Sequence, residues 1–381
     1  MRILHTADWH LGKIVNEFSM LDLQENYLKE LVEKTKELEV DVVIMAGDLY
    51  DRSIPPKEAV SLANKAFTKL TQEVGVPVLV IAGNHDSNER VEFGSEMFVG
   101  SQLYIEGTTK ETVRKVTIAD VNFYLLPYDD HRNIRSVLGD ESIRNPEEAL
   151  IAQMEKIKEE WDPEAVNVLL YHGFMVNKSA SADEELETSD SERTLSVGTV
   201  EYVPASLVED FDYVALGHLH KAQRVKGEHI RYSGSPLKYS KSEANYRKQD
   251  LLVDLTKDSL VVESLEIKPK KDLRVIRGLF EDILKDSSED YIFFELEDAS
   301  FVLDAMNRLR RKYPFAMGLE YIHQQEKEKH ALNHSRKKLK TFKPEELFGD
   351  FYEENTQNAL NEAQKEAVIK TFEEIRKEET R

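Results

Sequence analysis

The sequence contains no cysteine, which excludes disulfide bonds and thiolate metal sites. It also lacks a run of about 18 apolar residues, the length that a membrane-spanning helix requires. No G-x-x-x-x-G-K-[ST] segment occurs, so the chain has no P-loop of its own. The opening residues MRILHTADWH pass directly into an expected strand, without the apolar core of a signal peptide. We therefore expect a cytoplasmic protein with no membrane partner.

Positive charge is scarce as well. Lys and Arg number 51 against 72 Asp and Glu, for a net charge of −21. This balance argues against nucleic acid as a partner, because DNA binding depends on basic side chains that neutralise phosphates. The sign changes locally, however. Residues 323–341 carry six basic and two acidic residues (6 − 2 = +4), and residues 343–381 carry six and eleven (6 − 11 = −5). Whole-chain charge therefore does not identify the partner.

The first part of the chain alternates short apolar strands with amphipathic helices, which is typical of βαβ units. The expected elements are strands at 3–6, 42–46 and 78–82, helices at 21–38 and 57–72, a hairpin of 113–118 and 121–126, a helix at 146–160, and strands at 166–171, 213–216 and onward to 262. We predict that residues 1–268 form one α/β (α+β) domain. Its expected architecture is a β-sandwich of two mixed sheets flanked by helices.

Three further segments are expected after Ile267. Residues 269–322 show a β-α-β-α-β pattern, with strands at 273–276, 291–296 and 318–322 and helices near 280–285 and 301–313, and we predict a small capping domain. Residues 323–342 are a basic linker. Residues 343–381 are a helix pair, whose second helix has an apolar stripe of Leu360, Ala363, Ala367, Val368, Thr371, Phe372 and Ile375. The stripe either folds back on its own chain or docks on another protein.

Side chains that bind metals follow five of the expected strands. They are Asp8 with His10, Asp48, Asn84 with His85, His172, and His218 with His220. In an extended chain, residues i and i+2 point to the same side. We therefore expect the pairs Asp8/His10 and His218/His220 each to direct two side chains into one space. Gly47, Gly83, Gly173 and Gly217 lie beside these positions, where a close approach of backbone favours a residue without Cβ.

Each of these residues has an ordinary structural explanation when it is taken alone. His172 fits a hydrogen-bonded core histidine, Asp8 a cap and Asn84 a turn. Together they place five of the eleven histidines at apolar strand ends, where unpartnered polar groups cost about 1–3 kcal/mol each. Metal ions remove this cost, and seven ligands exceed the coordination of one ion. We therefore predict two divalent ions that share a carboxylate.

The ligand mixture also indicates the chemistry of the predicted centre. Imidazole, carboxylate and amide oxygen together suit manganese, iron or zinc better than magnesium or calcium. Two ions about 3.5–4 Å apart can activate water and stabilise an in-line displacement at phosphorus. The sequence therefore predicts hydrolysis of a phosphoester.

The segments DWH, GDLYD, GNHD, YHG and GHLH, in this order, resemble the calcineurin-like metallophosphoesterase family. Nearly the whole chain, including SERTLSVGTVEYVP at 191–204, is similar to the SbcD nuclease branch of that family. The resemblance implies that Asp48 bridges two ions and that His85 assists at the phosphate without binding metal. It further implies that the Asp51 carboxylate orients His85. The other implied ligands are Asp8, His10 and His220 for one ion and Asn84, His172 and His218 for the second.

The resemblance also implies a function and partners. The expected activity is that of a manganese-dependent DNA nuclease, a 3'-5' exonuclease on double-stranded ends and an endonuclease on single strands and hairpins, in repair, recombination and replication. The expected partner is an SbcC-type coiled-coil ATPase, docked on residues 343–381. A homodimer within a heterotetramer is implied too. It would use the helix at 57–72, although core packing is the alternative for that helix's stripe of Ala59, Ala63, Ala66, Phe67 and Leu70.

Two other functions remain open from the residues. A phosphatase or phosphodiesterase for a small-molecule or protein phosphate uses the same metal core, and Asp51-Arg52 resembles the phosphatase segment Asp-Arg-Gly, with Ser53 in place of glycine. A scaffold with a vestigial site is disfavoured, because every ligand type is present. The segments after Lys271 favour the nuclease, since a small-substrate phosphatase has no need of them. Candidates for following a DNA backbone, each an ordinary surface charge when taken alone, are Arg132, Arg135, Lys178, Lys221, Arg224, Lys238 and Lys241.

Overall fold

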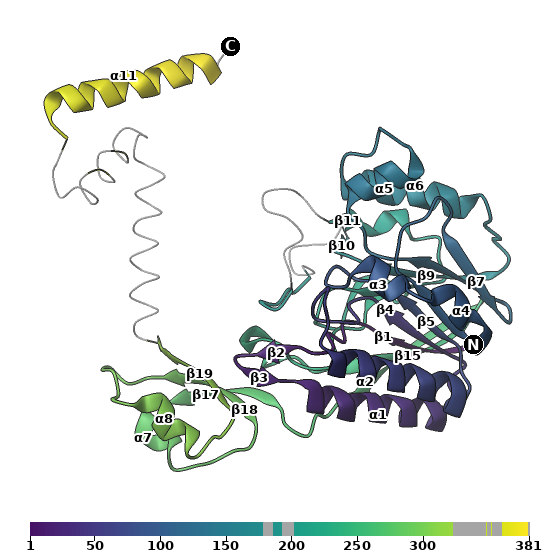
Figure 1. The fold of residues 1–381 in the computed structure, drawn as a ribbon, viewed down its shortest axis with the longest axis horizontal. Helices are drawn as coiled ribbons and strands as arrows, with labels where there is room; N and C mark the ends of the chain where they lie inside the picture. Colours follow the sequence, from purple (N-terminus) through teal and green to yellow (C-terminus); the bar gives the residue numbers. More distant parts are fainter. Residues whose placement is uncertain (178–185, 193–201, 323–347, 349–351, 353–359, 380–381) are drawn as a thin grey trace. The chain divides into compact units, whose positions relative to one another are not determined.

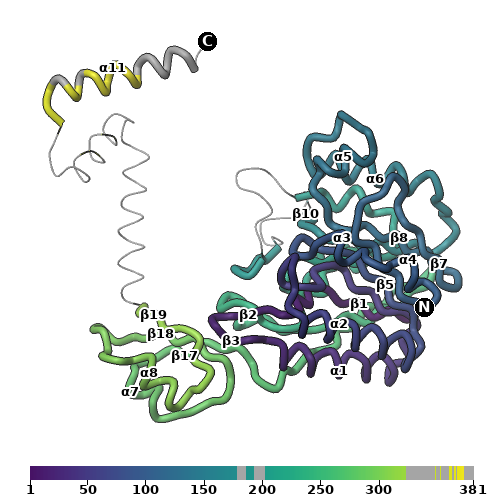
Figure 2. The backbone as a smooth tube through the Cα atoms, viewed as in Figure 1, coloured from purple at the N-terminus to yellow at the C-terminus, as the bar shows by residue number. Residues whose placement is uncertain are grey.

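The computed structural model describes residues 1–177, 186–192, 202–322, 348, 352 and 360–379 (Figures 1 and 2). The predicted basic linker 323–342, most of the first C-terminal helix, residues 193–201 of the SERTL segment and Lys178 lie outside the described residues. Within the described ranges, no helix combines the length and the apolar character needed to cross a bilayer.

Two six-stranded mixed sheets form the body of the first 268 residues. The first sheet has the order β16-β15-β1-β4-β5-β6. Its strands are β1 (Arg2–Thr6), β4 (Val42–Ala46), β5 (Val78–Ile81), β6 (Leu103–Glu106), β15 (Gln249–Thr256) and β16 (Ser259–Glu266). Strands β1, β4, β5 and β6 are parallel, and β15 and β16 add an antiparallel edge. The carboxyl ends of β1, β4 and β5 therefore lie at one edge.

The second sheet has the order β13-β14-β12-β9-β8-β7. Its strands are β7 (Arg114–Ile118), β8 (Val121–Leu126), β9 (Val166–His172), β12 (Tyr213–Gly217), β13 (Gln223–Lys226) and β14 (Ile230–Tyr232). Strands β8, β9, β12 and β14 are parallel. The predicted hairpin is confirmed: β7 and β8 are antiparallel, and Ala119 in their turn has a φ of 51°.

The two sheets pack face to face, and helices cover their outer faces. Because side chains alternate along a strand, Ile3, Val42 and Ile44 contact the second sheet across the sandwich. Their neighbours Leu4 and Val43 pack on the other face with α1 (Leu21–Glu37) and α2 (Lys57–Thr68). These two helices run side by side in Figure 1. Helix α6 (Pro146–Lys158) covers the outer face of the second sheet. The predicted flanked sandwich is confirmed.

The helix predicted at 57–72 is interrupted. Helix α2 ends at Thr68, and a π-helical turn, Lys69–Val74, continues to Gly75, whose φ of 85° closes the segment. The apolar stripe is buried in the core of its own chain, with Ala59 and Leu70 at 0% exposure. Core packing therefore explains the stripe, and the sequence-based expectation that this stripe makes a dimer is wrong. The sheet beneath α2 already covers the stripe.

The sequence analysis missed several short elements. They are β2 (Ile14–Val15), β3 (Phe18–Ser19), α3 (Asn88–Glu92), α4 (Ser95–Phe98), α5 (His131–Leu138), β10 (Met175–Val176) and β11 (Val203–Pro204), together with β6. Helix α5 has a clear local cause. The side chain of Asp130 accepts a hydrogen bond from the main-chain nitrogen of Arg132, and Gly139 closes the helix in a left-handed conformation.

The strands and helices predicted within residues 269–322 are present. Strands β17 (Leu273–Gly278), β18 (Tyr291–Leu296) and β19 (Ala316–Tyr321) form a sheet in that order, with α7 (Phe280–Ile283) and α8 (Ala305–Arg310). The second C-terminal helix is α11 (Glu362–Glu379). Contacts divide the chain into one unit of Met1–Ile276, Asp286–Phe294 and Met306–Gly318 and a second of Arg277–Lys285, Glu295–Ala305 and Leu319–Arg381. The domain boundaries 268/269, 322/323 and 342/343 stay predictions.

Candidate metal centre

The candidate centre lies where strand ends of the two sheets meet. The loops after β1 and β4 are joined by main-chain hydrogen bonds, from Asp8 N to Gly47 O and from His10 N to Asp48 O, both 3.0 Å. The second sheet reaches the same place, because His172 Nδ1 lies 2.8 Å from the carbonyl oxygen of Ala46. A Cβ atom on Gly217 would overlap that carbonyl group. Glycine is therefore required at this close approach.

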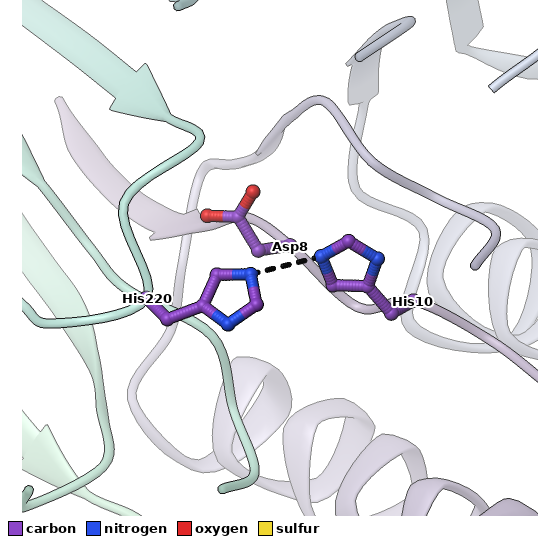
Figure 3. Close-up of side chains that lie close together, drawn as sticks. All are labelled: Asp8, His10 and His220. Atoms are coloured by element: carbon purple, nitrogen blue, oxygen red, sulfur yellow. Dashed lines mark hydrogen bonds between the residues drawn. The ribbon is translucent and has the colours of Figure 1, made fainter. Parts of the chain in front are cut away.

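One group of predicted ligands comprises Asp8, His10 and His220. Figure 3 shows the two imidazole rings edge to edge with the carboxylate beside them. The Nε2 atoms of His10 and His220 are 3.0 Å apart. One candidate ligand atom from each of the three residues lies within 4.8 Å of the others, and all three residues are buried. The structure thus brings together residues separated by more than 200 positions in the sequence.

A second group surrounds Asn84. Its Oδ1 atom is 3.0 Å from His172 Nε2 and 3.1 Å from His218 Nδ1. Asp48 lies between the two groups, since its Oδ2 atom is 3.5 Å from both His10 Nε2 and His172 Nε2. All seven predicted ligands therefore meet in one place, and Asp48 occupies the position between the groups.

The chemistry of these side chains fits divalent cations. Asp8 is fully buried, and burial, followed by the nearby Asp48 carboxylate, raises the pKa of Asp8 well above its ordinary value. Burial lowers the pKa of His10 and His218, which favours the neutral ring that binds metal. His10 Nδ1 and Asn84 Nδ2 are buried without a hydrogen-bond partner. Adjacent carboxylates and neutral imidazoles at such spacing are stabilised when cations lie between them.

Backbone conformation, and not strand periodicity, directs the paired ligands. Strand β1 ends at Thr6 and β12 at Gly217, so Asp8/His10 and His218/His220 follow the strands. Asp8, His10 and His218 have φ values of 53°, 45° and 111°, and Asp48 has 57°. Positive φ is uncommon outside glycine. The expectation that an extended chain aligns each pair is therefore wrong, since left-handed turns bring the side chains together.

His85 lies beside the cluster and, like Asn84, is partly exposed, whereas the other six ligand-type residues are buried. Its main-chain nitrogen donates to Asp48 Oδ1 at 2.8 Å, and its ring packs against that of His10 with centroids 4.7 Å apart. The atom of Asp51 that meets His85 is the main-chain oxygen, 3.0 Å from Nδ1. The Asp51 carboxylate pairs with Lys13 Nζ at 2.7 Å, lies 3.9 Å from His10 Nδ1, and has an oxygen within 4.8 Å of a ring nitrogen of His85. An orienting role of this carboxylate for His85 stays a prediction.

Asp86 is a structural member of the centre that the sequence analysis left out. Its carboxylate accepts hydrogen bonds from the main-chain nitrogens of Leu49, Tyr50 and Gly83 at 2.9–3.0 Å. Burial, and then the Asp48 carboxylate, raise the pKa of Asp86 to about 7. The position of Asp86 inside the GNHD segment was the available signal, because a buried aspartate next to ligand residues commonly holds loop amides.

Most of the basic residues proposed to follow DNA have partners within the chain. Arg132 pairs with Asp130 at 2.7 Å and Lys238 with Asp272 at 2.9 Å. Lys221 pairs with Glu187 and Arg224 with Glu228. These ion pairs reduce the positive potential that the side chains present, so the sequence-based list overstates the basic surface.

The sandwich with its strand-end cluster defines a class of protein. Residues 1–222 match the family model for calcineurin-like phosphoesterases, a class with a dinuclear metal centre that the present residues fit. Residues 269–356 match the model described as type 5 capsule protein repressor C-terminal domain. The chain is also 33% identical over 374 residues to the SbcD subunit of the SbcCD nuclease of Staphylococcus epidermidis, covering 97% of each chain. It therefore belongs to the SbcD family of nuclease subunits, as the sequence analysis predicted.

Two solved structures are also similar to this chain. One is a dimetal phosphatase from Danio rerio, with 14% identity, 71% of this chain and 99% of that chain covered, and a TM-score of 0.42. The other is a protein of Thermus thermophilus, with 16% identity, coverage of 69% and 98%, and a TM-score of 0.40.

Proposed function

We propose that this chain is a metal-dependent DNA nuclease subunit that hydrolyses phosphodiester bonds. The observation that carries the proposal is the meeting of seven ligand-type side chains, with Asp48 between the other six, in a chain of the SbcD family. Family membership favours DNA over the alternative, a phosphatase or phosphodiesterase acting on a small-molecule or protein phosphate. The specific digestion modes, 3'-5' exonuclease and single-strand or hairpin endonuclease, belong to the same proposal.

Each side chain has a proposed role. Asp8, His10 and His220 would hold one ion, Asn84, His172 and His218 the other, and Asp48 both. When bound, two divalent ions activate a water molecule for attack and neutralise charge that develops on the phosphate oxygens. The mixed nitrogen and oxygen ligands support manganese as the metal. The chain's own contribution is to hold these side chains in fixed positions before substrate arrives.

His85 is the proposed proton donor. Its Nδ1 faces the carbonyl oxygen of Asp51, an acceptor that requires a proton on Nδ1. Nε2 is then the ring atom available to the substrate. In the protonated ring, Nε2–H can give its proton to the leaving oxygen as the phosphodiester bond breaks. The ring of His85 is partly exposed, so a substrate phosphate can reach it, which supports this role.

The partners are proposals as well. An SbcC-type ATPase would supply ATP hydrolysis and dock on residues 343–381. A homodimer would assemble through exposed apolar side chains near α2, α3 and α4. Ile54, Val60, Phe93 and Met97 are 72%, 45%, 82% and 82% exposed, and exposed apolar groups of this kind commonly mark an interface. Cytoplasmic location stays a prediction.

Cleavage assays test the proposed function. Metal-free full-length chain is supplied with Mn²⁺ and given end-labelled linear duplex, hairpin DNA or p-nitrophenyl phosphate, with and without the coiled-coil ATPase. We expect DNA cleavage, with His85→Gln lowering it by about 10²-fold while ion binding remains. His131→Gln on α5 is the matched control and should cleave normally. Hydrolysis of p-nitrophenyl phosphate without DNA cleavage under any condition would favour the phosphatase.

Removal of residues 343–381 tests the docking proposal. The shortened chain should lose association with the ATPase in sedimentation or pull-down measurements and keep weak metal-dependent cleavage. Unchanged affinity for the ATPase would place the docking surface elsewhere.

A further inference from the structure

On the side of its ring away from His10, His220 contacts a polar network of Ser191, Glu243 and Lys248. Its Nε2 atom faces His10, in the group with Asp8. Its Nδ1 atom lies 2.7 Å from Ser191 Oγ and 3.3 Å from Glu243 Oε1. Ser191 Oγ also bonds the same Glu243 oxygen. One side of the ring therefore meets the candidate centre and the other side meets a hydroxyl and a carboxylate.

Lys248 completes this network. Its Nζ atom lies 2.5 Å from Glu243 Oε2 and donates to the carbonyl oxygen of His220 at 2.9 Å. The side chains of Glu243 and Lys248 are 0% and 3% exposed. A buried carboxylate without a counter-ion is strongly unfavourable, so Lys248 allows Glu243 to remain charged beside the ring. Neither group reaches the surface, and neither can touch a polymer substrate.

The segment 186–192 contributes to the same network. Glu192 Oε1 accepts from the main-chain nitrogen of His220 at 2.7 Å, next to the Ser191 contact. Gln223 exchanges two hydrogen bonds with the main chain of Glu187, at 2.8 and 3.0 Å. The start of the SERTL segment is thereby fastened to the loop that carries His220. Ser191 and Glu192 therefore have a structural role, which is to hold the loop that carries His220. This role is separate from the proposed cleavage step.

We infer that Ser191, Glu243 and Lys248 are positioning residues that fix the ring orientation and tautomer of His220. A carboxylate at Nδ1 keeps the proton on that nitrogen and leaves the Nε2 lone pair for the metal, and it makes the ring a stronger donor. His172 provides the contrast within the same centre. Its Nδ1 faces the neutral carbonyl oxygen of Ala46 at 2.8 Å, whereas Nδ1 of His220 faces a hydroxyl and a carboxylate.

The inference predicts unequal effects on the two ions. It rests on the proposed assignment of Asp8, His10 and His220 to one of them. Glu243→Gln should lower the affinity for that ion by about 10–100-fold, the range for lost outer-shell partners. The affinity for the other ion should stay within about threefold of the wild-type value. Ser191→Ala should lower the affinity for the same ion by a smaller factor than Glu243→Gln does. Glu263 is an exposed glutamate on β16, so Glu263→Gln is the matched control and should leave the affinity for both ions unchanged.

Calorimetric titration of the metal-free full chain with Mn²⁺ measures both affinities. Side-chain ¹⁵N NMR of the metal-free chain measures the tautomers: His220 should carry its proton on Nδ1 in the wild type and become mixed in Glu243→Gln, while His172 stays unchanged. Because Glu243→Gln leaves Lys248 unpaired and can unfold the chain, the double variant E243Q/K248M removes both charges together and should show the same selective loss.

Equal affinities in variant and wild type for both ions, or an unaltered His220 tautomer, overturn the inference. A loss of equal size at both ions also overturns it, because a general loosening of the fold acts on both groups. A wild-type chain that binds no ion refutes the proposed metal centre instead, so the two failures are distinguishable.

Discussion

The carboxylate of Asp86 accepts a hydrogen bond from the main-chain nitrogen of Leu49 at 3.0 Å, across 37 residues of sequence. The same oxygen accepts from Gly83 N at 2.9 Å. One side chain thus ties the loop after β4, which carries Asp48, to the loop after β5, which carries Asn84 and His85. Ligands from separate strands keep their spacing because this carboxylate joins the loops.

Asp86→Ala should therefore destabilise the fold. It leaves the buried amides of Leu49 and Gly83 and the partly buried amide of Tyr50 without an acceptor. A buried unpaired amide costs about 1–3 kcal/mol, so we expect a loss of at least about 2 kcal/mol in the free energy of unfolding. Urea denaturation measures it. Asp120→Ala, in the exposed β7–β8 turn, should stay within about 0.5 kcal/mol of wild type. Equal midpoints for both variants would contradict the role of Asp86.

Gly83→Ala should disrupt the centre directly. A Cβ at this position would overlap the main-chain nitrogen and Oδ1 of Asp48, so the proposed bridging carboxylate must move. We expect metal content after dialysis against Mn²⁺ to fall below that of wild type, as measured by elemental analysis. Gly100→Ala is the control, because a Cβ there meets no atom within 4 Å. Full metal content in Gly83→Ala would show that Asp48 can move without loss of binding.

Stability should depend on pH through Asp250. Its Oδ1 accepts from Tyr27 at 2.8 Å, its Oδ2 is buried without a partner, and burial raises its pKa from 3.8 to about 6. The folded chain thus binds this proton more tightly than the unfolded chain, and the resulting stabilisation is present below about pH 4 and lost as pH rises through about 6.

Asp250→Asn removes this titration. The unfolding free energy of the variant minus that of wild type should rise by up to about 3 kcal/mol between pH 4 and 6 and stay level above that range. Urea denaturation at a series of pH values measures the difference. Parallel pH profiles for the two proteins would show that Asp250 titrates alike in the folded and unfolded chain.

Met97→Glu should weaken the proposed homodimer. Met97 is 82% exposed on α4, near the exposed Phe93, and a carboxylate there would be desolvated in an apolar interface. At a protein concentration of tens of micromolar, light scattering should give the molar mass of a dimer for the wild type and that of a monomer for Met97→Glu. Val261→Glu, at an exposed apolar position on β16, should remain dimeric. A monomeric wild type at this concentration would refute the dimer.

The sequence predicted much of the fold because its strands are short, apolar and regularly spaced. Val42–Ala46, Val121–Leu126 and Tyr291–Leu296 were predicted at their observed bounds. The seven ligand-type residues could be predicted because each lies at the end of such a strand or shortly after it. The short strand pair Ile14–Val15 and Phe18–Ser19 was missed, since two residues are too few to show periodicity.

Features that depend on contacts across the chain could not be predicted. The support of His220 comes from Ser191 and Glu243, which lie 29 residues before and 23 residues after it, and no local pattern marks such a pair. The contact between the carbonyl oxygen of Asp51 and His85 Nδ1 also could not be predicted. Sequence motifs indicate side chains, but they do not indicate which backbone atom lies nearby. Positive φ at Asp8 and His10 also leaves no pattern in composition.

The left-handed conformations of four ligand-type residues lower the stability of the fold while they position the side chains of the proposed centre. Asp8, His10, Asp48 and His218 all have φ between 45° and 111°, a region that glycine adopts more easily and that costs other residues of order 1–3 kcal/mol. Glycine at these positions would relieve strain and delete a ligand in the same step. A laboratory selection for heat resistance alone would thus tend to erase the centre, and consensus design of a more robust variant should hold these four positions fixed.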